Sequence, residues 1–131
     1  MDQKILWAVN HMPKTEDKNL PIMSVVEVKK ARAFHESIPQ YQVTPLADLK
    51  NMAEYLGLAK ACVKDESYRF GLNAFKVLGG SYAIARYIAK ETKRDISQMP
   101  YSVLTSKELR DEFGQATFFS ATDGNHGRGV A

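Results

Sequence analysis

The stretch DESYRFGLNAFKVLGG, residues 65–80, decides the fold of this protein. A short apolar strand pattern at about 59–63 precedes it and an apolar helix pattern follows, so Lys76 falls where a strand gives way to a helix. We expect the apolar neighbours of Lys76 to strip water from its ammonium group and to favour the neutral amine, which can form a Schiff base. The alternative is a solvated lysine whose stem lies on apolar neighbours.

A second segment that can contribute residues to a functional site lies near the other end of the sequence. The run FFSAT, residues 118–122, is typical of a buried strand, and it enters the glycine-rich loop DGNHGRG, residues 123–129. Strands that alternate with helices predict an α/β fold, in which a parallel sheet carries helices on its faces and binds ligands at the carboxyl ends of its strands. Because Lys76 and Asn125 both follow such ends, we expect them to meet in one site.

Together these segments resemble the fold type II (tryptophan-synthase-β-type) family of pyridoxal-phosphate enzymes, in which a Phe-Lys pair opens a helix and a Gly-Asn-His turn ends a later strand. The longer runs 64–76 and 122–131 look like the signature of its diaminopropionate ammonia-lyases. The resemblance implies a carbon–nitrogen lyase of amino-acid catabolism that uses pyridoxal 5'-phosphate. Such an enzyme converts D- and L-2,3-diaminopropionate to pyruvate and ammonia, and the resemblance also implies a homodimer.

The same resemblance implies a role for each residue of the site. Lys76 would bind the cofactor covalently and then remove the α-proton of an L-amino acid, with Phe75 beside the cofactor ring. Asn125 would hydrogen-bond the ring hydroxyl, and Asp123 would act on the α-proton of the D-isomer. Backbone amides would hold the substrate carboxylate. The resemblance implies that the substrate-binding residues would be Thr122, Gly124, Asn125 and His126.

Other interpretations of these residues remain open. Phe75 can be a core aromatic, Asn125 a left-handed turn residue and Asp123 a helix N-cap. A serine/threonine dehydratase-like enzyme is a second possible function, although residues 73–76 (NAFK) and Asp123 depart from its Ser-Phe-Lys pattern. A non-catalytic phosphate-binding α/β module is a third, and the glycine loop lacks the Gly-x-Gly-x-x-Gly and Gly-Lys-Ser/Thr spacings that it would need.

Composition and charge narrow the function classes. The chain has 131 residues, 44% hydrophobic and 25% charged, which is the balance of one globular domain. A net charge of +3 from 18 basic and 15 acidic residues spread along the chain does not indicate a nucleic-acid partner. No apolar run reaches membrane-spanning length, and no histidines or cysteines stand at metal-ligand spacing. The lone Cys62 is expected to be buried, and we expect a reducing, cytoplasmic location.

The pattern divides the chain into an N-terminal arm, residues 1–23, and a partial α/β cofactor-binding region, residues 24–131. Capping and proline signals predict a helix from Ser24 to Pro39 and a second from Thr44-Pro45 through Leu46 to Gly57. Further helices are expected near 79–90, nearly enclosed, and near 104–113. Strands are expected near 59–63 and 117–121. We expect the chain to be an N-terminal fragment, truncated after the asparagine loop and inactive alone.

Overall fold

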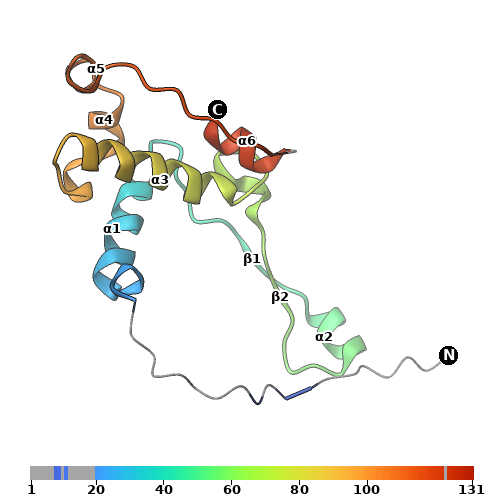
Figure 1. Ribbon diagram of the computed structural model, residues 1–131. Helices are drawn as coiled ribbons and strands as arrows, with labels where there is room; N and C mark the ends of the chain where they lie inside the picture. Colours follow the sequence, from blue (N-terminus) through green and yellow to red (C-terminus); the bar gives the residue numbers. More distant parts are fainter. Residues whose placement is uncertain (1–7, 10, 12–19, 123) are drawn as a thin grey trace.

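The computed structural model describes residues 8–9, 11, 20–122 and 124–131, so most of the expected N-terminal arm lies outside the described residues. One part of the molecule consists of helices arranged around α3 (Lys76–Glu91) (Figure 1). The other α-helices are α1 (Val25–Glu36), α2 (Lys50–Leu56), α4 (Tyr101–Leu104), α5 (Lys107–Phe113) and α6 (Asn125–Val130). The strands are β1 (Leu46–Asp48) and β2 (Cys62–Lys64). A thin arm made of β1, α2 and β2 leads away from the helices around α3 (Figure 1). Short 3₁₀ turns are η1 (Pro21–Met23), η2 (Glu66–Gly71) and η3 (Ile96–Gln98).

The first helix follows its sequence signals. The Ser24 hydroxyl accepts a hydrogen bond from the backbone N–H of Glu27 at 3.3 Å, which satisfies one free donor of the first turn. α1 ends at Glu36, shortly before Pro39, and it buries Phe34 in the core. The expected helix from Ser24 is therefore confirmed.

The core lies where α1, α3 and the segment after α3 pack together. Its buried members are Phe34, Ala85, Ala89, Ile96, Met99 and Leu109. Ala85 and Ala89 on α3 and the fully buried Met99 belong to the same cluster as Phe34 of α1. α3 was expected to be nearly enclosed, but among its described residues only Ala85 and Ala89 are buried, so that prediction is wrong.

The sheet differs from the expected one. β1 pairs with β2 antiparallel, with Leu46 opposite Lys64 and Asp48 opposite Cys62, and the described residues form no parallel pair. Thirteen residues, including α2, connect the end of β1 to the start of β2. They turn the chain back so that β2 runs antiparallel beside β1. The expected helix start at Thr44-Pro45 is therefore wrong, because Leu46 enters a strand and α2 begins at Lys50. Its predicted end at Gly57, in the left-handed conformation with φ 65°, is confirmed.

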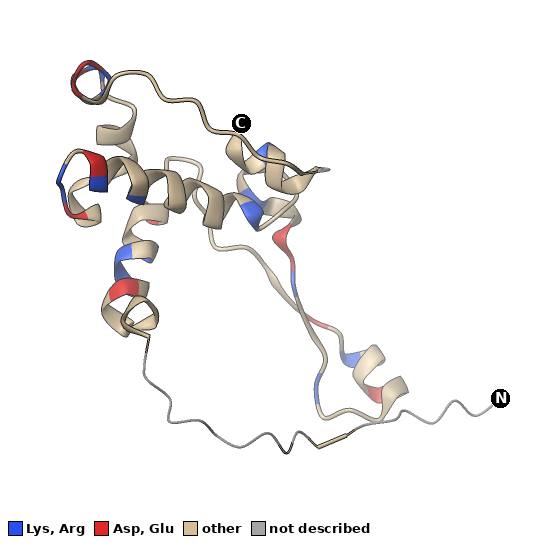
Figure 2. Ribbon diagram, viewed as in Figure 1, with Lys and Arg blue, Asp and Glu red and all other residues tan. Residues whose placement is uncertain are grey.

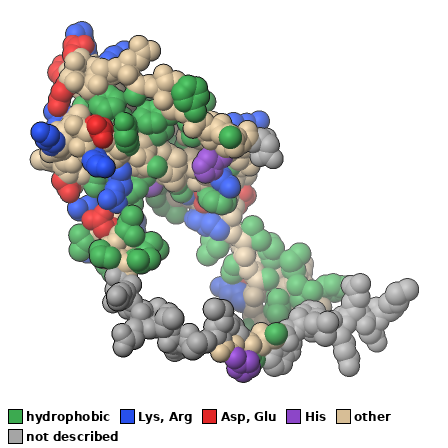
Figure 3. Space-filling model, viewed as in Figure 1, with side chains coloured by type: hydrophobic (Ala, Val, Ile, Leu, Met, Phe, Trp, Pro, Cys, Tyr) green, Lys and Arg blue, Asp and Glu red, His purple; other side chains and the backbone are tan. Residues whose placement is uncertain are grey.

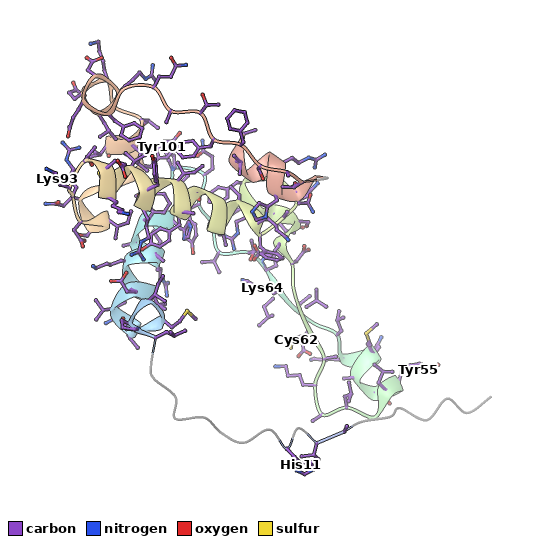
Figure 4. The ribbon with its side chains drawn as sticks, viewed as in Figure 1. His11, Tyr55, Cys62, Lys64, Lys93 and Tyr101 are labelled. Atoms are coloured by element: carbon purple, nitrogen blue, oxygen red, sulfur yellow. The ribbon has the colours of Figure 1, made fainter. Side chains whose placement is uncertain are left out.

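The arm formed by β1, α2 and β2 has no second layer over it. Every residue of both strands is exposed, and Tyr55 on α2 is 89% exposed at the far end of the arm (Figure 4). Hydrophobic side chains gather over this end (Figure 3). Cys62, expected to be buried, is exposed for the same reason.

The last third of the chain also departs from expectation. The helix expected near 104–113 is two helices, α4 and α5, because the Ser106 hydroxyl caps α5 by accepting from the Leu109 N–H at 3.1 Å. Residues 117–121 form no strand pair among the described residues, and Phe119 is 92% exposed. The expected buried strand is thus exposed chain here, and it leads into α6.

Charge, hydropathy and the grouping of metal-ligand residues add three observations. Lysines, arginines and carboxylates are interspersed over α1, α3, α5 and the arm, without a single basic face in this view (Figure 2). Among the described helices, none has the length and apolar character needed to cross a membrane. Within the same residues, His, Cys, Asp and Glu form no group of three that could hold a metal ion.

Candidate cofactor and substrate site

The structure brings the two sequence motifs together around one hollow. The hollow has a volume of about 740 Å³ and lies between the start of α3 and the turn that opens α6. Its lining residues are Lys76, Ser120, Ala121, Thr122, Gly124, Asn125 and His126. The predicted meeting of Lys76 with the asparagine turn is therefore seen in the geometry, although the two segments lie about fifty residues apart in the sequence.

Thr122 holds the shape of this turn. Its side-chain oxygen accepts hydrogen bonds from the N–H groups of Gly127 at 3.0 Å and Gly124 at 3.4 Å. The N–H groups of Asn125 and His126, in the first turn of α6, have no acceptor within the part of the chain that the structure describes. Both residues line the hollow, and N–H groups in the first turn of a helix can bind a carboxylate.

Asn125 itself opens α6. It is not among the described non-glycine residues with positive φ, so its interpretation as a left-handed turn residue is wrong. Its side-chain amide lines the hollow, where it can donate or accept a hydrogen bond.

Lys76 and Phe75 are more exposed than expected. Lys76 is exposed, and its Nζ lies 5.9 Å from the centroid of the Phe75 ring, which is itself 58% exposed. The predicted apolar enclosure of Lys76 is therefore wrong. Phe75 is likewise not a core aromatic in this structure.

The first turns of α3 are tied to α1. The His35 Nε2 lies 2.8 Å from the carbonyl oxygen of Leu78, to which it donates as the Nε2–H tautomer. Burial lowers the pKa of His35, which favours the neutral ring. The Ser81 hydroxyl donates to the carbonyl of Val77 at 2.7 Å. These bonds fix the backbone just beyond Lys76.

The loop before Lys76 contains unusual backbone geometry. Phe70 has φ 50°, Gly71 φ 70° and Asn73 φ 54°, and a positive φ is costly for a residue as bulky as phenylalanine. Such conformations persist where the surrounding structure over-determines them, often at functional sites. Here the surrounding structure is a hydrogen-bonded cluster centred on the buried Arg69.

Arg69 is the centre of that cluster and is 5% exposed. Its guanidinium donates two hydrogen bonds to the Glu66 carboxylate, at 2.8 and 2.9 Å, and one to the carbonyl of Gln42 at 2.9 Å. The Thr44 hydroxyl completes the network, donating to Glu66 and accepting from Arg69 at 3.2 Å. This use of Thr44 explains why it does not cap the helix that the sequence predicts at Leu46.

The hydrogen bonds from Arg69 lower the pKa of Glu66 from 4.5 to about 2. The folded state therefore favours the ionised form of Glu66 over its protonated form more strongly than the unfolded chain does. Its contribution is fully present above pH 4.5 and is lost as pH falls toward 2. The pKa difference corresponds to about 3 kcal/mol.

We therefore expect Glu66→Gln to lower the free energy of unfolding of the full-length protein by about 3 kcal/mol at pH 7, because Arg69 would be left buried without its partner. The variant should also lose less stability than the parent between pH 5 and 3. Urea unfolding across this pH range measures both effects. Glu36→Gln, which removes an exposed ion pair with Arg32, is the matched control and should change little. Equal effects of the two changes would contradict the role given to the cluster.

Two points separate the observed site from the predicted one. Ser120 lines the hollow and was missed, because it was assigned to a buried strand. Asp123 lies outside the described residues, so the structure does not place the carboxylate that was assigned to the D-isomer.

Comparison with curated proteins supports the resemblance to diaminopropionate ammonia-lyases, while no family model matches the chain. It is 50% identical over 99 residues to the diaminopropionate ammonia-lyase of Salmonella typhimurium, a match that covers 76% of this chain and 24% of that protein. With the Escherichia coli K12 enzyme it shares 46% identity over 112 residues, 85% of this chain and 27% of the relative. The chain therefore spans about a quarter of the length of these relatives.

Comparison with solved structures gives the same family as the comparison with curated proteins. The apo form of E. coli diaminopropionate ammonia-lyase matches with a TM-score of 0.73 and 46% identity over 85% of this chain and 29% of that one. The same enzyme in complex with D-serine gives a TM-score of 0.68 at 42% identity over 85% and 27% of the two chains. Its complex with an aminoacrylate-PLP azomethine reaction intermediate matches with a TM-score of 0.68 and 45% identity, over 85% of this chain and 26% of that chain. The expected resemblance is thereby confirmed.

Proposed function

We propose that this chain forms part of a pyridoxal-phosphate-dependent ammonia-lyase that acts on 2,3-diaminopropionate. One observation carries the proposal: the Lys76 amine and the turn at Asn125 line the same hollow. The similarity to diaminopropionate ammonia-lyases, one of them solved with a PLP reaction intermediate, supports it independently.

The lining residues suit the cofactor and an amino-acid substrate. Lys76 carries a primary amine, and Asn125 and His126 add a side-chain amide and two N–H groups at the start of α6; all three residues line the hollow. These are the groups that can hold an aldehyde carbon, a ring hydroxyl and a carboxylate. When bound, pyridoxal phosphate supplies an electron sink for the carbanion that forms at the α-carbon of the substrate.

Each residue then has a defined task. Lys76 holds the cofactor through Nζ, and the released amine accepts the α-proton of the L-substrate. Asn125 orients the cofactor ring through its amide, and Phe75 lies beside Lys76. The N–H groups of Asn125 and His126 bind the substrate carboxylate, while Thr122 and Gly124 maintain the turn that presents them.

The overall reaction consumes water and releases two molecules of ammonia for each pyruvate. Loss of the α-proton allows the β-amine to leave, and hydrolysis of the remaining imine gives the second ammonia. For the D-substrate we assign the proton transfer to Asp123, acting from the face opposite Lys76. The solved complex of the E. coli relative with D-serine supports binding of D-amino acids in such a site.

We also propose a fold type II architecture, with a cytoplasmic homodimer as the functional form. The apolar and exposed residues 117–122 suit a strand that pairs in the longer protein. The exposed thiol of Cys62 suits a reducing compartment. The exposed apolar side chains of the arm suit an interface that another part of the assembly covers.

The direct test is an assay of the full-length protein with D- and L-2,3-diaminopropionate and, separately, L-serine. The proposal expects pyruvate and ammonia from both diaminopropionate isomers, in a ratio of one to two, and weaker turnover of serine. Preference for serine would favour the dehydratase alternative. No turnover of either substrate by protein that has been saturated with cofactor would contradict the proposal.

A further inference from the structure

The helix that carries Asn125 touches the helix that carries Lys76 through a glycine. α6 lies against the first part of α3 (Figure 1). A Cβ added at Gly129 would lie 2.8 Å from the Val77 Cα and 3.0 Å from the Val77 backbone nitrogen. Both are backbone atoms of a helix, so no side-chain rotation can relieve the contact.

This contact lies next to both halves of the site. Val77 directly follows Lys76, and Gly129 lies one helical turn after Asn125 on α6. The distance between the two helices at this point therefore sets the distance between the Lys76 amine and the asparagine turn. Any side chain at position 129 has to move one helix away from the other.

We propose that Gly129 is a positioning residue, whose missing side chain sets the spacing of Lys76 and Asn125 that cofactor binding needs. The inference rests on the proposed function and deepens it. Gly129 touches neither substrate nor cofactor in this account, and it acts only through the packing of α6 on α3. Displacements of about 1 Å in such arrangements change catalytic rates by about 100-fold.

Two other glycines provide matched controls on the same helix pair. A Cβ at Gly80 would lie 3.4 Å from the carbonyl oxygen of Gly129, an ordinary contact, and a Cβ at Gly79 would meet nothing within 4 Å. None of these three glycines is among the described residues with positive φ, so alanine is conformationally allowed at each. Alanine also has the higher helix propensity, so a loss at position 129 would come from the contact and not from the backbone.

The experiment compares Gly129→Ala, Gly80→Ala and Gly79→Ala in the full-length protein. Cofactor affinity is measured by titration with pyridoxal phosphate, and hydrogen exchange of the α6 amides is measured in cofactor-free protein. Gly129→Ala should weaken cofactor affinity by about 10-fold or more and speed exchange at Arg128 and Ala131, whose N–H groups bond within the turn. The other two variants should stay within about twofold of the parent.

Gly80→Val is a second variant that tests the same contact if Gly129→Ala does not fold. Gly80→Val presses on α6 from the α3 side, because its added methyl groups exceed the room that a single Cβ fills, and it should also weaken cofactor binding. If folded Gly129→Ala or, failing that, Gly80→Val binds the cofactor within twofold of the parent, the positioning role is wrong. If the parent protein itself does not bind pyridoxal phosphate, the proposed function fails. The positioning role is then decided by the exchange data alone, and unchanged exchange in Gly129→Ala overturns it.

Discussion

Replacing Lys76 by alanine in the full-length protein should reduce ammonia-lyase turnover by about 10⁴-fold or more with both substrate isomers. Lys76 is the only lysine that lines the hollow among the described residues. The change removes the group that holds the cofactor in both reactions, and it also removes the proton acceptor for the L-isomer. Initial rates of pyruvate release, measured at saturating cofactor, give the size of the loss.

Lys90→Ala is the matched control for this change. Lys90 is exposed on the same helix, near its other end, and should be replaceable without loss of turnover. Circular dichroism of both variants checks that α3 still forms. Substantial activity in folded Lys76→Ala protein would rule out the role given to this amine.

Asp123→Asn should separate the two substrate isomers. The role proposed for Asp123 gives it the α-proton of the D-isomer alone, so turnover of D-2,3-diaminopropionate should fall about 100-fold or more, while turnover of the L-isomer changes by only a few-fold. The rates kcat and kcat/KM, measured separately for each isomer, give this comparison. Asp111→Asn removes an exposed carboxylate that pairs with Lys107 on α5, and it should affect neither isomer.

The pattern of losses decides between interpretations of Asp123. Equal losses with both isomers would instead favour a role in capping α6 or in placing the cofactor. No loss with either isomer would leave Asp123 without a part in the chemistry.

Local signals in the sequence predicted helix ends, whereas the meeting of the two motifs was predicted from a parallel sheet that the described residues do not form. Ser24 caps α1 and Gly57 ends α2 because hydroxyl caps and left-handed glycines act within one turn of the chain. In this structure Lys76 and Asn125 come together by another route, because each opens a helix and α6 packs against α3.

Features that depend on distant partners could not be predicted from local pattern. Thr44 looks like a helix cap in sequence, but the buried Arg69–Glu66 pair takes its hydroxyl, and Leu46 then joins a strand. An apolar strand pattern also does not say which segment covers it. Residues 118–122 and Cys62 were expected to be buried, and both are exposed. Gly129 gives no signal in sequence beyond a glycine in a loop, since its importance comes from Val77 on another helix.

The central claim is that Lys76 is the residue that holds the cofactor. Borohydride reduction of the full-length protein loaded with pyridoxal phosphate fixes the cofactor to the lysine that binds it, and peptide mapping by mass spectrometry identifies that lysine. The account predicts one modified residue, Lys76. Lys64, on β2 of the arm (Figure 4), is the nearest alternative in sequence, and its amine donates a hydrogen bond to the carbonyl of Thr44. Stoichiometric modification of Lys64 or any other lysine, with Lys76 unmodified, would contradict the account.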